Sequence, residues 1–297
     1  MAATREKRSF VLPTYITLPM YGLSRYLPGL ATRLALYLFF RPLRFPVPKR
    51  EEPIRAQMKR HELQTAKGDP FTAWRLGETG PPVVLMHGWS GRGSQFFDLI
   101  KRLAPHFQVC ALDAPGHGAH QGKPTHMLAF VEALEVANDH FGPFQHGIGH
   151  SLGGMVLFNG FLSQINFQTL SVIGTPANVD NVVGDFCEKI RAHRKVYHRI
   201  IQYIEKRYQL KTSEVSTDTL SRQYPRPGII AHDEADVDVP AANAQELHQA
   251  WPAAQLFLSE GYGHRRILSH PLLLEALERL LKQEGPASCI KDKKNES

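Results

Sequence analysis

A serine stands between closely spaced glycines in the stretch HGIGHSLGG, residues 146–154. Its centre, Gly149-His150-Ser151-Leu152-Gly153, follows an apolar run and precedes a segment with helical periodicity. A serine on a sharp strand-to-helix turn adopts a strained backbone, and glycines two positions away on either side leave room for neighbouring elements. A flexible glycine turn is the alternative, but the position between a strand and a helix favours a nucleophilic Ser151.

A serine hydroxyl is a weak nucleophile near neutral pH, so it needs a base and an acid that orients the base. His264 stands in a loop, GYGHRRIL, after the last strand-like run, and Asp236 stands in the loop after the preceding run, within HDEADVDVP. The order Ser151, Asp236, His264 suits this chemistry. Asp238 and Asp233 are alternatives for the acid, although Asp233 directly follows its strand and suits capping or turning of the loop.

The helix after Ser151 directs its first backbone N–H groups toward the carbonyl that the serine would attack. We therefore expect the Leu152 N–H to bind the negatively charged oxygen of the tetrahedral intermediate. We expect His87 and His150 to make hydrogen bonds or to pack, and Cys110 to be a buried hydrophobic residue. The spacing of the histidines contains no H-E-x-x-H pattern, so the sequence predicts no metal, and it carries no phosphate-binding or dinucleotide-binding fingerprint.

The elements that position these residues alternate between strands and helices. An antiparallel hairpin is expected from about residue 56, around Gly68-Asp69-Pro70, and short apolar runs separated by helical patterns follow it. Unbroken apolar strands of this kind predict an α/β fold with a mostly parallel sheet covered by helices on both faces. The expected strands cover residues 83–86, 109–112, 146–149, 170–173, 228–231 and 255–258, and the expected helices cover 95–103, 127–140, 155–162, 242–251 and 271–282.

Three segments lie outside this alternation. Residues 1–55 are an arm with a short apolar run, Leu34 to Phe40, bracketed by arginines. This run is too short to span a bilayer and suits either an amphipathic helix in a lipid interface or a helix packed on the domain's own flank. A helical insert fills residues 177–227, and residues 285–297 form a polar tail that we expect to be disordered. The domain proper is thus expected at 56–284.

Charge and composition exclude several classes of protein. The 297 residues carry a net charge of +7, but residues 1–60 hold 12 Lys/Arg against 3 Asp/Glu, so the rest of the chain is slightly acidic. A nucleic-acid-binding protein would carry the charge on its folded face. Three cysteines at wide spacing form no disulfide framework, which favours a reducing compartment, and the N-terminus shows no signal-peptide cleavage pattern.

The ordered motifs together resemble the α/β-hydrolase superfamily, from about residue 82 to 281. They are His87-Gly88-Trp89, the D-x-P-G-H-G of Asp113 to Gly118, GHSLGG, D-x-x-V-P and G-x-G-H-x-x-x-L. The resemblance implies that the Trp89 N–H is the second donor to the oxyanion and that the insert at 177–227 is a lid. Residues 1–55 lie outside the pattern.

We therefore predict a serine hydrolase that cleaves small-molecule carboxylic esters through a Ser151, His264, Asp236 triad and an acyl-enzyme, without a cofactor. An acyltransferase, a thioesterase or a peptidase would use the same triad, and a non-catalytic binding protein on the same scaffold is a further alternative. We expect a cytoplasmic protein that does not bind nucleic acid, with peripheral membrane contact through residues 1–55 as a hypothesis. The substrate and the oligomeric state are not predicted.

Overall fold

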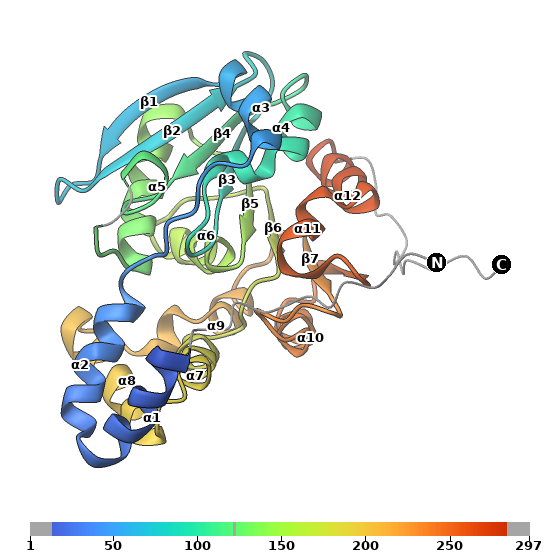
Figure 1. The fold of residues 1–297 in the computed structure, drawn as a ribbon. Coiled ribbons are helices and arrows are strands. Elements are labelled where there is room, and N and C mark those ends of the chain that lie inside the picture. Colours follow the sequence, from blue (N-terminus) through green and yellow to red (C-terminus); the bar gives the residue numbers. More distant parts are fainter. Residues whose placement is uncertain (1–13, 121–122, 284–297) are drawn as a thin grey trace, which may run out of the picture.

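In the computed structural model, which describes residues 14–120 and 123–283, the chain forms an open sheet with helices on both faces (Figure 1). The strands follow the order β1-β2-β4-β3-β5-β6-β7-β8. Strand β2 pairs antiparallel with β1 and β4, and all other neighbours are parallel. The predicted hairpin and parallel sheet are confirmed. The strands are β1 (Lys59–Gln64), β2 (Pro70–Leu76), β3 (Pro82–Met86), β4 (Gln108–Asp113), β5 (His146–His150), β6 (Thr169–Ile173), β7 (Gly228–Asp233) and β8 (Ala254–Ser259).

The central strands are buried on both faces, which explains their continuous apolar runs. One face packs on α5 (Met127–Phe141), α6 (Leu152–Leu162) and α10 (Ala242–Ala250), and the other face packs on α3 (Glu52–Gln57), α4 (Phe97–Leu103) and α12 (Pro271–Leu281). Two short helices, α9 (Thr217–Ser221) and α11 (Gly263–Arg266), complete the connections around the sheet. The predicted helices are thus found, with shifts of a few residues at their ends.

The insert and the arm pack together as a helical layer at one end of the sheet (Figure 1). The insert supplies α7 (Val179–Lys189) and α8 (Arg194–Tyr208), and the arm supplies α1 (Thr14–Tyr26) and α2 (Pro28–Phe39). Alanines of α2 and Met20 of α1 share an apolar cluster with Val183, Val196 and Ile200 of the insert. The arm therefore packs on the insert, which agrees with the alternative of a helix on the domain's own flank. Residues 1–13 and the predicted tail lie outside the described residues.

The apolar run of the arm, Leu34 to Phe40, lies mostly in α2, a helix of 12 residues. Within the described ranges, no helix is both long enough and apolar enough to cross a bilayer.

Candidate active site

Ser151 occupies the turn between β5 and α6 in a conformation that L-residues rarely adopt, with φ 54° and ψ −123°. The residues two positions before and after it must be glycines for steric reasons. A Cβ on Gly149 would lie 2.5 Å from the backbone N of Gly154, and a Cβ on Gly153 would lie 2.0 Å from the backbone O of Met86. The turn therefore holds α6 directly against β3 and β5, and it lifts the serine side chain out of the sheet edge.

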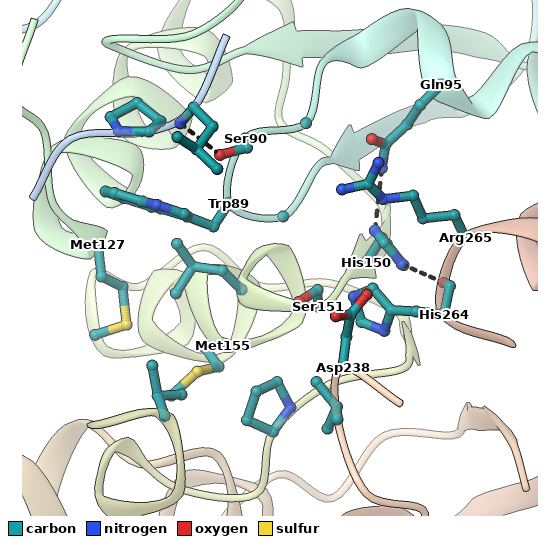
Figure 2. A pocket seen from close by; sticks show the side chains of 18 of the residues that line it. Trp89, Ser90, Gln95, Met127, His150, Ser151, Met155, Asp238, His264 and Arg265 are labelled. Carbon is teal, nitrogen blue, oxygen red and sulfur yellow. Dashed lines mark hydrogen bonds between the residues drawn. The ribbon is translucent and has the colours of Figure 1, made fainter. Parts of the chain in front are cut away.

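His264 and Asp236 meet at the same edge of the sheet, although 28 residues separate them in sequence. The Nδ1 atom of His264 lies 2.7 Å from Oδ2 of Asp236, and Gly174 leaves room for this contact because a Cβ there would lie 3.2 Å from Nδ1. A proton on Nδ1 that is donated to the carboxylate leaves the Nε2 lone pair available as a base. Both Ser151 and His264 line one cavity (Figure 2), but among the described residues the Ser151 hydroxyl makes no hydrogen bond to His264.

The Asp236 carboxylate is buried and accepts hydrogen bonds on both oxygens. Oδ1 accepts from the backbone N–H groups of Asp238 (2.8 Å) and Val239 (3.0 Å), and the buried His232 places Nε2 3.4 Å from Oδ2. Burial by itself raises the pKa of Asp236, but hydrogen bonds from His232 and His264 more than reverse that effect and hold the pKa well below its usual range. Asp236 is therefore ionised at neutral pH beside the imidazole.

The two alternative acids have other contacts. Oδ2 of Asp233 accepts from the Ser259 hydroxyl (2.9 Å) and the Tyr262 N–H (2.8 Å), so this residue ties β7 to the end of β8 and to the segment that leads into α11, the short helix that carries His264. Asp238 has a side chain 31% exposed, and its nearest cation is Lys189, with Nζ 3.9 Å from Oδ1. Among the described residues, only Asp236 forms a hydrogen bond or ion pair with the His264 side chain.

The expected oxyanion donors lie on either side of the serine. Leu152 is the first residue of α6, where backbone N–H groups have no intrahelical acceptor. Trp89 lies in the loop after β3, and this loop approaches the serine so closely that a Cβ on Gly88 would lie 3.2 Å from Ser151 Oγ. Ser90, with φ 59°, donates its N–H to Nε2 of His117 at 2.9 Å, which holds the loop in place.

Comparison with known proteins adds to this geometry. Residues 83–277 match the alpha/beta hydrolase family. The chain belongs to that family. A pimeloyl-(acyl-carrier protein) methyl ester esterase of Xanthomonas campestris is 37% identical over 95 residues, which are 32% of this chain and 36% of that protein. The enzyme of the same name from Xanthomonas oryzae is 27% identical over 243 residues, 68% of this chain and 95% of that protein.

The fold agrees with this membership. An esterase of Pyrococcus furiosus aligns with a TM-score of 0.62 at 16% identity, over 82% of this chain and 98% of that one. The family predicted from the ordered motifs is therefore confirmed. The alignment with the Xanthomonas campestris protein spans only about a third of that protein's length.

Two buried histidines of the α/β-hydrolase core, His87 and His117, hold loops in place. His87 is buried between the Ala114 N–H, which donates to Nε2 at 3.0 Å, and the Gly88 carbonyl, 2.7 Å from Nδ1. Burial lowers its pKa to about 4, and burial likewise lowers that of His117 to about 3. Burial also raises the pKa of the Cys110 thiol to about 12, so the thiol is not a nucleophile at neutral pH.

His150 packs beside the nucleophile and also supports His264. Its Nε2 lies 2.8 Å from the backbone O of His264, and its Nδ1 lies 3.1 Å from Nε2 of Gln95 (Figure 2). The sequence predicted packing here, and the structure adds a hydrogen bond to the catalytic loop. Nothing in the sequence indicated it, because it joins residues 114 positions apart.

The cavity beside Ser151 has a volume of about 940 Å³, and the arm and the insert form much of its wall. Phe39, Phe40, Leu43 and Phe45 of the arm line it opposite the core residues. The Leu43 N–H donates to the Ser90 hydroxyl at 2.9 Å, so the arm is tied to the loop that carries Trp89. Sequence reasoning assigned no chemistry to residues 1–55, and the only available signal was the density of aromatic residues among prolines at 39–48.

Proposed function

We propose that this α/β-hydrolase is a serine esterase that cleaves carboxylic esters with an aliphatic acyl chain. One observation carries the proposal. The His264 imidazole is held through Nδ1 by the buried Asp236 carboxylate, in the cavity where Ser151 stands on a strained turn. A carboxylate fixed in this way stabilises the imidazolium that forms when the serine is deprotonated.

In the proposed reaction, Ser151 Oγ attacks the ester carbonyl while Nε2 of His264 takes the hydroxyl proton. The Trp89 and Leu152 N–H groups hold the oxyanion of the tetrahedral intermediate. His264 then gives the proton to the leaving alcohol, and an acyl-enzyme forms on Ser151. Water attacks the acyl-enzyme with His264 as the base again, so the products are a carboxylic acid and an alcohol.

The cavity supports an acyl chain as part of the substrate. Its wall includes Met127, Met155, Val182 and Phe186, which offer apolar and adaptable surfaces to a chain. The curated relatives are named for a methyl ester of a pimeloyl group on an acyl-carrier protein, which also contains an aliphatic acyl chain. We extend only the chemical class, an aliphatic acyl ester, to this chain.

Labelling with a fluorophosphonate probe tests the proposal most cheaply, followed by hydrolysis of p-nitrophenyl esters of increasing chain length. The wild-type chain should be labelled, and Ser151→Ala should be unlabelled with kcat lower by about 10⁴- to 10⁶-fold. Turnover by Ser151→Ala near the wild-type rate would refute the mechanism. Absence of labelling in a folded wild-type chain would favour a binding protein. Product analysis with thioester or peptide substrates, and with an alcohol as the acyl acceptor, separates the alternative reactions.

Peripheral membrane contact through residues 1–55 also remains a proposal. Its support is the surface of α1 and α2, which the esterase reaction does not use.

A further inference from the structure

The arm, with helices α1 and α2, carries most of the large apolar side chains that the described part of the chain exposes. The described part of the chain exposes twelve large apolar side chains, and eight of them lie between residues 18 and 43. The remaining four are scattered over the rest of the described residues. The eight are Leu18 (67% exposed), Tyr21, Tyr26 (79%), Leu27, Leu30, Leu34, Tyr37 and Leu43.

The exposed side chains on α2 form one stripe. Leu30, Leu34 and Tyr37 follow one another at spacings of four and three residues, which places them on one side of the helix, and the exposed Leu27 directly precedes its first residue. The opposite side of α2 is buried against the insert through Ala31, Thr32 and Ala35. The helix therefore has two apolar sides, and only one of them packs on the protein.

Charge indicates what covers the exposed side. Residues 14–50 contain no Asp or Glu and six basic residues, which are Arg25, Arg33, Arg41, Arg44, Lys49 and Arg50. Leucines flanked by arginines and tyrosines suit the interface of an anionic bilayer, where the aromatic rings lie at headgroup level and the cations meet lipid phosphates. A second copy of the chain would instead bring two surfaces of the same charge together.

The same helix also reaches the cavity. Leu38 and Phe39, at the end of α2, line it, and the Phe39 ring packs on that of Phe186 with centroids 5.0 Å apart. Tyr37, the last residue of the exposed stripe, is therefore followed directly by residues of the cavity wall.

We propose that the exposed surface of α1 and α2, here called the arm surface (Leu18, Tyr21, Tyr26, Leu27, Leu30, Leu34 and Tyr37), docks on an anionic lipid bilayer, from which an acyl ester enters the cavity. The entry of the ester rests on the proposed esterase function. Docking itself requires no catalysis, so the two can fail separately.

Vesicle co-sedimentation of the full chain tests the docking. The probes are vesicles of phosphatidylcholine alone and of phosphatidylcholine with phosphatidylglycerol, at low and at physiological salt. Leu27→Gln/Leu30→Gln/Leu34→Gln introduces glutamine, which is also a good helix former, and should weaken partitioning to anionic vesicles by about tenfold or more. Arg25→Gln/Arg33→Gln should weaken it by a similar factor at low salt and less at high salt. The matched control is Leu162→Gln/Leu272→Gln, which changes exposed leucines elsewhere and should bind as wild type.

Three outcomes would overturn the proposal. They are wild-type binding that ignores phosphatidylglycerol, unchanged binding by the triple variant, and a wild-type dimer in light scattering that the triple variant converts to a monomer without any vesicle binding. The triple variant should hydrolyse a soluble butyrate ester at the wild-type rate, since none of its changed residues lines the cavity. Ser151→Ala should bind vesicles as wild type does, so an error about the reaction leaves the docking result intact.

Discussion

Replacing Asp236 with Asn tests the role of this carboxylate more sharply than deleting it. Oδ1 accepts two backbone N–H groups, from Asp238 and Val239, and only a carbonyl oxygen can take that place in Asn. The amide NH₂ is therefore forced into the position of Oδ2, 2.7 Å from Nδ1 of His264. An NH₂ group there requires a lone pair on Nδ1, so the imidazole proton moves to Nε2 and His264 no longer acts as a base.

The expected cost follows from this tautomer. Asp236→Asn should lower kcat for a soluble p-nitrophenyl ester by about 10⁴-fold, or about 5.5 kcal/mol of transition-state stabilisation, with KM changed little. Asp238→Asn is the matched control and should stay within about threefold of wild type, because no hydrogen bond or ion pair joins its side chain to His264 and its partly exposed carboxylate is only weakly paired with Lys189. Thermal unfolding should confirm that both variants fold. Activity of Asp236→Asn within about tenfold of wild type would refute the reasoning, and a large loss in Asp238→Asn alone would assign the acid to Asp238.

Three further predictions concern packing, pH and the cavity. Gly153→Ala should lower the free energy of unfolding by about 3 kcal/mol or more, because its Cβ would overlap a backbone oxygen of β3. Its control, Gly184→Ala, lies in an open helical position and should raise the free energy of unfolding by about 0.5–1 kcal/mol in a urea titration. Equal changes in the two variants would contradict the steric argument. The buried His87 and His117 bind fewer protons in the folded state than in the unfolded state, because burial lowers their pKa values. The urea concentration at the midpoint of unfolding should therefore fall as the pH drops from about 6.5 toward 4. A midpoint that is constant over that range would show that these two histidines are not held neutral. Met127→Trp narrows the cavity, so it should lower kcat/KM for esters of long acyl chains by about tenfold or more and leave kcat/KM for a butyrate ester unchanged. A uniform loss of kcat/KM across chain lengths would indicate that the acyl chain does not lie beside Met127.

Much of the fold was predictable because its signals are local. Apolar runs such as VVLM indicate strands buried on both faces, and β3 is such a strand. The glycines around Ser151 report a steric demand that the turn imposes, so the strand-to-helix position of the serine could be read directly from the sequence. The place of Asp236 and His264 at the ends of consecutive strands predicted that they lie at one edge of the sheet.

The contributions of the arm could not be read in the same way. Residues 42–48 belong to no helix or strand and are rich in proline, without a periodicity that reveals which side chains face a cavity. The Leu43 N–H donates to the Ser90 hydroxyl across 47 positions of sequence, a contact that no local pattern indicates. The same reason hid the bond from His150 to the backbone of His264. Contacts between distant segments depend on the assembled fold, which local patterns do not encode.

Mapping the site of acylation tests the central claim most directly. A p-nitrophenyl acyl ester mixed rapidly with the enzyme, quenched in acid and digested for mass spectrometry should leave the acyl group on the peptide that contains Ser151. The same experiment with Ser151→Ala should leave no acylated peptide. Acyl transfer to another residue of the wild-type chain, or turnover without any trapped acyl group at Ser151 under conditions where deacylation is slow, would contradict a mechanism in which His264 and Asp236 activate this serine.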